Sequence, residues 1–252
     1  MKAEIYSVEG KKTGTIELPS QFNHPVRIDL IKRAVFAIHS HNYQPYGADP
    51  KAGTRQGKAT PKRRHKFGTT YGYGISRVKR KRTWRRGSRF GWTAAFVASA
   101  VKGRKAFPPK SEKVIREKIN KKERRKAICS AISGVNSLVV EDKFEDYKKL
   151  KQVATVLNKI GLKKDLERPK QKKVRAGRGT TRGRKYKRKK GLLIVASKKC
   201  PLLKSAANLP GVDITEVKNL NAKLLAPGAQ PGRKTIWTKA AIEKLAKENL
   251  FK

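Results

Sequence analysis

The sequence predicts an α/β fold with a mostly parallel central sheet, helices on both faces in three α/β/α layers, and a long extended basic loop. GLLIVAS (191–197) is a near-continuous apolar run, typical of a strand buried on both faces of a parallel sheet. Short strand-like segments alternate with segments of helical period, as in βαβ units. Residues 51–111 contain no acidic residue at all and interrupt this alternation.

The first forty residues predict a hairpin followed by a helix. AEIYSV alternates in polarity, EGKKTG has turn composition, and TIEL reads as the returning strand. Pro19 and Pro25 bracket a loop. From Asp29 onward the apolar residues recur at helical spacing, namely Leu30, Ile31, Ala34, Val35, Ala37 and Ile38.

Regular structure is expected to return after the FPPK sequence. Asn120 and Glu123 have the spacing of a capping pair and predict the start of a helix with one apolar face. LVVE (138–141) is a short apolar run of strand type. A second helix is expected over residues 147–160, and Gly161 ends it.

The last part of the chain alternates between strands and helices. After 191–197, we expect a helix in CPLLKSAANL (200–209), a strand in DITEV (213–217), a loop in LAPGAQPG (225–232) and a strand in KTIWT (234–238). Thr238 then caps a final helix. The inward face of that helix is formed by Ala241, Ile242, Leu245 and Ala246.

These elements predict a single α/β domain over residues 1–252. Its body comprises 1–45 and 112–252, and residues 46–111 form a long basic extension. Residues 168–190 form a second basic loop, with thirteen basic residues among twenty-three. Loops of this length within a compact domain are usually functional or disordered.

The charge balance restricts the possible partners. Among 252 residues, 64 are basic and 18 acidic, which gives a net charge of +46. Such a charge destabilises a compact state unless a partner neutralises it. Nucleic acid, an anionic membrane or an acidic protein could do so. A membrane is the weakest of the three, because the sequence lacks both an apolar run of about 18 residues and a signal peptide.

The basic extension has the composition of an RNA-binding segment. Its nineteen lysines and arginines alternate with glycines and aromatic residues, which suit phosphate contact and base stacking. Like charges at this density should keep the strip from closing on itself without a polyanion. A plain solvated tail would usually lack the aromatics. For KRKK (187–190) alone, a solubilising or nuclear-type charge run stays an equal alternative.

The residues predicted to bind RNA are mainly arginines, whose planar guanidinium pairs with phosphate and stacks on bases. They are Arg55, Lys62, Arg63, Arg64, Arg77, Arg80, Lys81, Arg82, Trp84, Arg85, Arg86, Arg89, Arg104, Lys105, Arg175, Arg178, Arg182, Arg184, Lys185, Tyr186, Arg188 and Arg233.

The glycine-rich segments do not match nucleotide-binding motifs. GAQPGRKT (228–235) has three residues between its glycines where a P-loop has four, and it runs into a strand instead of a helix. GRGTTRG (177–183) follows no strand. Glycines beside arginines are better explained as places where the backbone approaches an RNA phosphate.

No catalytic or metal-binding arrangement stands out. His39 and His41 are two residues apart, so on a helix they point to different faces. Cys129 and Cys200 lack the spacing of a zinc site and are interpreted as ordinary buried or half-buried thiols in a reduced cytosol. The carboxylates that sit near lysines are interpreted as surface pairs, and these are Glu145, Asp146, Glu243 and Glu248. We therefore expect no enzyme, no cofactor and no metal.

Several strings, in order along the chain, closely resemble the archaeal and eukaryotic type of large-subunit ribosomal protein four. They are PVRIDLIKRAV, QPYGADPKAG, KGRKAFPPKSEK, INKKERRKAICSAI, VRAGRGTTRGRKYKRKK and LAPGAQPGRKTIWTKAAIEKL. The resemblance implies an α/β body on the exterior of the large subunit. It also implies an extension that passes through ribosomal RNA towards the polypeptide exit tunnel, beside large-subunit protein twenty-two and the nascent polypeptide.

The same resemblance assigns the tip of the extension to GTTYGYGISRV (68–78). The family's glycine-rich run is matched by Gly68, Gly72, Gly74 and Arg77, whereas Thr69, Thr70, Tyr71 and Tyr73 depart from it. The implied tunnel-tip residues are Gly68, Tyr71, Gly72, Tyr73, Gly74 and Ser76.

The expected function is that of a structural constituent of the large ribosomal subunit in the cytoplasm. It would bind and organise large-subunit ribosomal RNA during assembly and line the exit tunnel. An RNA-processing enzyme or a nucleotide-driven assembly factor is the alternative, but it would need a nucleotide or acid–base constellation. A histone-like DNA compactor fits the charge but not the α/β body.

Overall fold

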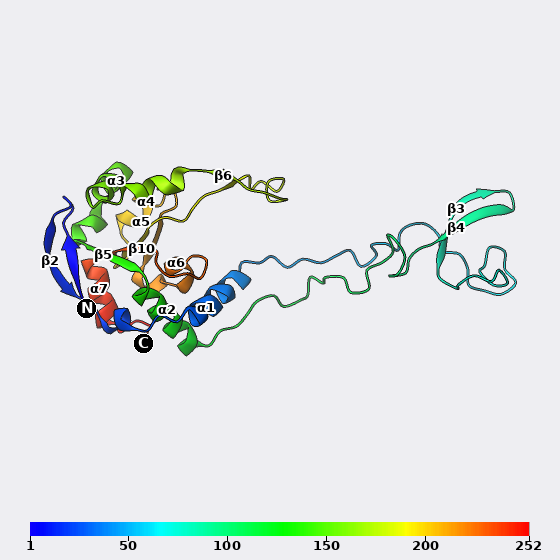
Figure 1. The fold of residues 1–252 in the computed structure, drawn as a ribbon, viewed down its shortest axis with the longest axis horizontal. Coiled ribbons are helices and arrows are strands. Elements are labelled where there is room, and N and C mark those ends of the chain that lie inside the picture. Colours follow the sequence, from blue (N-terminus) through cyan, green and yellow to red (C-terminus); the bar gives the residue numbers. More distant parts are fainter. Residues whose placement is uncertain (252) are drawn as a thin grey trace. The chain divides into compact units, whose positions relative to one another are not determined.

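A computed structural model describes residues 1–251 and divides the chain into two units. The first, here called the body, comprises Met1–Asn42 and Arg116–Lys252. The second, here called the excursion, is Tyr43–Ile115 and contains the acid-free strip. Each unit has its own secondary structure (Figure 1).

The body is built on a six-stranded sheet with the order β2-β1-β5-β10-β8-β9. β1 and β2 form the antiparallel hairpin that the sequence predicts, and every other neighbouring pair in this sheet is parallel. The α/β class and the mostly parallel sheet are therefore confirmed. The strands are β1 (Lys2–Tyr6), β2 (Lys12–Glu17), β5 (Asn136–Val140), β8 (Leu193–Ala196), β9 (Asp213–Glu216) and β10 (Lys234–Thr238).

Alternate side chains of the central strands enter two separate hydrophobic clusters. On β10, Trp237 belongs to one cluster and Ile236 to the other. Leu193 and Ile194 on β8 divide in the same way, because successive strand residues point to opposite faces. Trp237 is fully buried and packs edge-on against Phe22, with the ring centroids 5.3 Å apart. Apolar residues on both faces explain why GLLIVAS reads as one continuous run.

Each cluster is completed by its own set of helices. The Trp237 cluster receives apolar residues from α1 (Ile28–Ser40), α2 (Lys121–Ser133), α6 (Ala222–Leu225) and α7 (Lys239–Lys247). The Ile236 cluster receives them from α3 (Leu150–Lys159), α4 (Lys163–Glu167) and α5 (Pro201–Ser205). Four single 3-10 turns connect these elements: η1 (Ser20–Asn23), η2 (Asp142–Asp146), η3 (Arg168–Lys170) and η4 (Val217–Asn219).

The two predicted helix caps have different outcomes. The Thr238 side chain accepts a hydrogen bond from the Ala241 backbone N–H, so the cap of α7 is confirmed. Asn120 is the N-cap residue of α2, but within the described residues its side chain makes no capping bond. Glu123 instead forms an ion pair of 2.8 Å with Arg33 of α1. The predicted capping pair is therefore wrong, because a tertiary contact between helices takes the glutamate.

Glu145 also departs from the sequence interpretation. It was expected to be a surface residue paired with a lysine, but it is only 6 % exposed. Its carboxylate accepts hydrogen bonds from the Ser197 backbone N–H (2.7 Å), the Ser197 hydroxyl (2.8 Å) and the Thr238 hydroxyl (2.6 Å). Ser197 and Thr238 lie at the carboxyl ends of β8 and β10, so the glutamate joins two neighbouring strands.

The excursion contains an antiparallel hairpin that the sequence analysis did not anticipate. β3 (Arg80–Arg86) pairs with β4 (Arg89–Ala94), and Gly87 takes a positive φ of 53° in the turn. Two further segments of the excursion run side by side, where the Ala48 backbone N–H donates to the Pro109 carbonyl at 2.9 Å. The sequence predicts that the acid-free strip does not close on itself without a polyanion. The hairpin differs from this prediction.

Candidate RNA-binding surfaces

Aromatic side chains hold the loop before β3 against the hairpin. Phe67 packs edge-on against Phe90 with the centroids 5.4 Å apart, and Tyr73 packs in the same way against Trp92 at 5.6 Å. Phe90 and Trp92 are themselves 5.1 Å apart. We call these four residues the tip cluster. Edge-to-face pairs of this kind contribute about 0.5–1.5 kcal/mol each beyond their burial.

Arginines lie over the faces of the same rings. The Arg82 guanidinium carbon is 4.9 Å from the Phe90 centroid and 5.5 Å from that of Phe67. The Arg80 guanidinium carbon is 5.8 Å from the centroid of the Trp92 ring. A guanidinium over a ring face is attracted by the π electrons. This attraction offsets part of the repulsion among like charges, which explains how so basic a segment forms a hairpin.

Two glycines make room for these contacts. At Gly68, where φ is +76°, an added Cβ would overlap with the Arg82 guanidinium. At Gly91, which pairs with Trp84 across the hairpin, an added Cβ would overlap with the indole ring. Gly68 is therefore buried beneath an arginine, whereas the other glycines predicted for the tip, Gly72 and Gly74, are exposed.

Most of the residues predicted to bind RNA are exposed on the excursion. Arg80 and Lys81 are half-buried, and Trp84 is 55 % exposed. The remaining predicted residues of this unit are exposed: Arg55, Lys62, Arg63, Arg64, Arg77, Arg82, Arg85, Arg86, Arg89, Arg104 and Lys105. Lys66 and Lys79, which are not among the predicted residues, are equally exposed and carry the same local signal.

The predicted tunnel-tip residues differ in their surroundings. Tyr73 is 62 % exposed although it touches Trp92, and Ser76 is exposed and accepts a hydrogen bond from Arg80 at 3.2 Å. Tyr71 is half-buried, with the Arg77 guanidinium carbon 4.8 Å from its ring centroid and that of Arg64 at 5.8 Å. The two tyrosines therefore lie in different environments.

The second basic loop projects from the rest of the body in Figure 1 and has a small fold of its own. β6 (Lys173–Val174) pairs antiparallel with β7 (Tyr186–Lys187). Beyond this pair the Arg175 side chain donates to the Arg184 carbonyl at 3.1 Å, and Thr180 donates to the Arg175 carbonyl at 2.6 Å. The predicted residues Arg178, Arg182, Arg184, Lys185, Tyr186 and Arg188 are exposed, and Arg175 is half-buried.

Arg233 does not share this exposure, although it is among the residues predicted to bind RNA. Its side chain is 4 % exposed and donates hydrogen bonds to the carbonyls of Gly191, Leu192 and Leu224 and to the carboxylate of Asp213. The structure assigns this arginine to the interior of the body. Neighbouring glycines and lysine suggested a surface loop, but the loop packs its arginine inward.

Asp213 is a residue whose importance the sequence analysis missed. It accepts from Arg233 at 2.7 Å and from Lys190 at 2.9 and 3.0 Å. Burial raises the pKa of this carboxyl, but the hydrogen bonds from Lys190 and Arg233 outweigh that effect and hold the pKa below its usual value. A signal was available, because Asp213 is the first acidic residue after the acid-free stretch that begins at Arg168.

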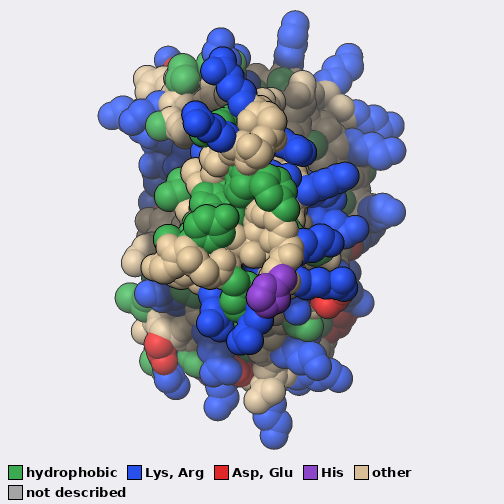
Figure 2. Space-filling model, turned by 90° about the vertical axis from the view of Figure 1, so that its right-hand side faces the viewer, with side chains coloured by type: hydrophobic (Ala, Val, Ile, Leu, Met, Phe, Trp, Pro, Cys, Tyr) green, Lys and Arg blue, Asp and Glu red, His purple; other side chains and the backbone are tan. Residues whose placement is uncertain are grey.

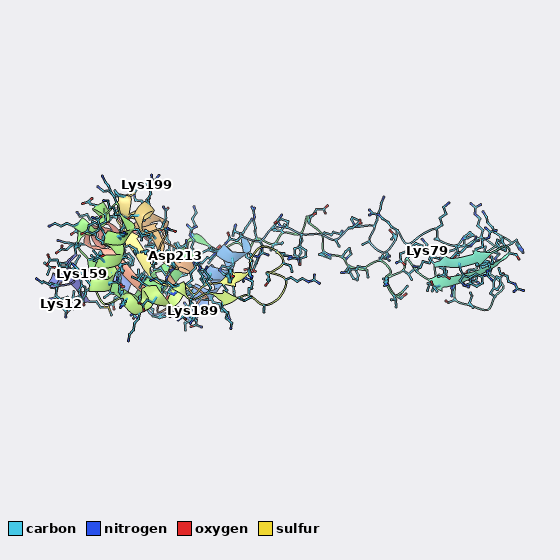
Figure 3. The ribbon with its side chains drawn as sticks, turned by 90° about the horizontal axis from the view of Figure 1, so that it is seen from above. Lys12, Lys79, Lys159, Lys189, Lys199 and Asp213 are labelled. Atoms are coloured by element: carbon cyan, nitrogen blue, oxygen red, sulfur yellow. The ribbon has the colours of Figure 1, made fainter. Side chains whose placement is uncertain are left out.

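The molecular surface is strongly basic. Figure 2 shows one face on which lysine and arginine side chains surround a patch of hydrophobic side chains, with few carboxylates between them. Figure 3 labels Asp213 within the body and Lys79 beside the hairpin of the excursion.

Other kinds of site find no support within residues 1–251. Over that range no cluster of three or more histidines, cysteines or carboxylates could hold a metal ion. None of the helices described has the length and apolar character needed to cross a membrane. Cys129 is buried and Cys200 half-buried, as expected, and burial raises the pKa of the Cys200 thiol.

The chain thus consists of an α/β body that carries two arginine-rich segments, and comparison with known proteins identifies its family. A model of the ribosomal protein L4/L1 family matches residues 16–248. The chain belongs to this family. It is 48% identical to the large ribosomal subunit protein uL4 of Nanoarchaeum equitans, over the whole of both chains.

Two further relatives carry the same name. The uL4 protein of Archaeoglobus fulgidus is 44% identical, with 97% of this chain and 98% of the relative covered. That of Methanocaldococcus jannaschii is 41% identical over the same shares. The resemblance inferred from the sequence strings is therefore confirmed at the level of the family.

Proposed function

We propose that this protein is a structural constituent of the large ribosomal subunit in the cytoplasm, and that it binds and organises large-subunit ribosomal RNA. The full-length similarity to uL4 proteins carries the proposal. The exposed arginines of two separate segments support it, because phosphate neutralisation supplies much of the affinity for RNA. In this proposal the protein acts without catalysis and without a cofactor.

The layered body and the two basic segments would each have a separate role in RNA binding. Helices packed on both faces of the sheet give a rigid three-layer body, from which the second basic loop contacts RNA. The excursion is the long basic extension, and in this proposal it contacts RNA segments other than those that the body contacts. Phosphates then neutralise a strip whose own charges repel one another. A single chain would thus connect distant RNA segments during assembly.

The finer part of the proposal concerns the tunnel. We propose that residues 68–78 line the polypeptide exit tunnel, next to the nascent polypeptide and to large-subunit protein twenty-two. Tyr73 supports this, since it is exposed in a stretch whose only charged residue is Arg77. An uncharged, exposed side chain is suited to a wall that a passing peptide touches.

Co-sedimentation tests the proposal as a whole. The chain should travel with large ribosomal subunits through a high-salt wash, because contacts distributed over two segments dissociate slowly. The control is the same chain with residues 51–110 replaced by a short Gly-Ser linker, which should be lost in the wash. Recovery of the intact chain only in ribosome-free fractions would contradict the proposal.

Substitution of the tip tyrosines tests the tunnel assignment. Tyr73→Ala should leave assembly nearly intact, because it removes no phosphate contact, and should change nascent-chain stalling or sensitivity to tunnel-binding antibiotics. Tyr71→Ala should act in the same direction. Deletion of the basic run 79–89 should impair assembly itself. If the tyrosine variants block assembly as severely as the deletion, the tip is an RNA clamp and not a tunnel wall.

A further inference from the structure

The two ends of the second basic loop are tied to each other and to the sheet. The Arg168 guanidinium donates to the Lys190 carbonyl at 2.8 Å, across the neck of the loop. Pro169 is buried against Gly191 and Gly211, where an added Cβ on either glycine would meet the proline ring. The loop therefore leaves the body through a tightly packed neck.

A charged network lies directly beneath that neck. Lys190 pairs with Asp213, and the same carboxylate accepts from the buried Arg233. Arg233 in turn donates to the carbonyls of Gly191 and Leu192, which connect Lys190 to β8. We call Arg168, Lys190, Asp213 and Arg233 the neck network. Arg168, Lys190 and Arg233 line one pocket together with Lys234, the first residue of β10, and Asp213 is the first residue of β9.

The ion pair between the buried Arg233 and the partly buried Asp213 is a costly way to gain stability, since desolvation offsets much of the attraction. Its geometry suits another purpose, because two hydrogen bonds from the Arg233 guanidinium hold the Gly191 and Leu192 carbonyls, where the chain leaves the loop for β8. A loop with thirteen basic residues repels itself and would otherwise sample many directions. Ordering it on binding would then reduce its affinity for RNA.

We propose that Arg233 and Asp213 are positioning residues for RNA binding: they touch no RNA but fix the direction in which the loop of residues 171–189 presents its arginines to ribosomal RNA phosphates. This inference rests on the proposed function. It assigns to an acidic residue a favourable role in the binding of a polyanion, which general electrostatics would not predict.

One substitution should change the affinity for RNA in opposite directions under general electrostatics and under the positioning role. Asp213→Asn removes a negative charge, so general electrostatics predicts equal or tighter RNA binding. The amide offers a single acceptor oxygen and turns an NH2 group towards one of the two cations, so the neck network loses a contact. We expect roughly tenfold weaker binding to large-subunit ribosomal RNA, the size of an ordering cost of one to two residues. Asp29→Asn, at an exposed pair with Arg27, is the matched control and should bind as tightly as the parent or more so.

Affinities are measured on the full chain by filter binding, at a temperature where circular dichroism shows each variant folded. Arg233→Lys keeps the charge but cannot make four hydrogen bonds, and it should weaken binding in the same direction. Both variants should also expose residues 171–189 to faster tryptic cleavage. Wild-type or tighter binding by folded Asp213→Asn would overturn the proposal.

A third variant separates this inference from the proposed function. Replacement of Arg178, Arg182, Arg184 and Arg188 by glutamine removes the contact groups and leaves the neck network in place. If it does not weaken RNA binding, the RNA-binding role proposed for this loop fails. If it weakens binding while Asp213→Asn does not, the positioning role alone fails.

Discussion

Single residues in this protein show how far the position of a charge can depart from what its neighbours in sequence suggest. Glu145 stands among lysines yet is buried with three donors around it, and Arg233 stands in a glycine-rich loop yet points inward. Sequence patterns reveal which residues are charged but not which strand ends will lie beside them. Both residues are placed by the meeting of β8 and β10, whose pairing is a long-range property of the sheet.

Glu145 gives a stability prediction at this scale. Glu145→Ala should lower the free energy of unfolding by about 2–4 kcal/mol, because it leaves the buried Ser197 N–H and two hydroxyls without their acceptor. The neighbouring exposed residue supplies the control, and Asp146→Ala should change stability by less than about 0.5 kcal/mol. Urea unfolding followed by circular dichroism measures both. Equal effects of the two substitutions would show that the buried contacts contribute little.

At the level of elements, apolar periodicity predicted helices and strands of the body, whereas charge density did not predict the hairpin of the excursion. The hairpin β1–β2, helix α1, strand β9, strand β10 and the Thr238 cap follow from local patterns in the sequence. The hairpin β3–β4 did not, because it is supported by contacts that form only once the strands pair, with Arg82 over the rings of Phe90 and Phe67. α5 covers only Pro201–Ser205 of the predicted ten-residue helix, since the chain bends at Ala206 and turns at Ala207 and Asn208.

The tip cluster allows a test of the hairpin. Phe90→Ala removes two aromatic pairs and the ring that carries Arg82, so tryptic cleavage between residues 62 and 89 of the free protein should become roughly tenfold faster. Phe107→Ala is the control in the same unit, because that ring is 98 % exposed, and it should leave the rate unchanged. Mass spectrometry of the fragments locates the cuts. Identical rates for both variants would mean that the cluster does not order the tip.

At the level of the whole molecule, the net charge of +46 decides how binding responds to salt. Neutralising ten or more phosphates gives a slope of log affinity against log salt of about −7 or steeper for single-stranded RNA. Replacing Arg80, Lys81, Arg85 and Arg86 by glutamine should make the slope shallower by about 3, if each meets a phosphate.

The matched control for that slope lies on the body. Lys148, Lys149, Lys151 and Lys159 are exposed around α3 and outside both basic segments, and their replacement by glutamine removes the same charge. The slope should then change by less than about 1. Filter binding between 50 and 400 mM salt, roughly the range over which counterion release is measurable, compares the variants. Equal changes for both sets would mean that total charge, and not the excursion, governs binding.

The position of β10 sets the order in which a newly made chain can fold. This strand follows all the other strands in sequence, yet it lies between β5 and β8 in the sheet. During synthesis, therefore, both basic segments are made before β10, the strand that joins the two halves of the sheet. Until β10 is made, β5 and β8 each have one unpaired edge. Closure of the core must therefore wait until β10 has been made, so nascent chains paused before Lys234 should expose both arginine-rich segments on an unfinished body.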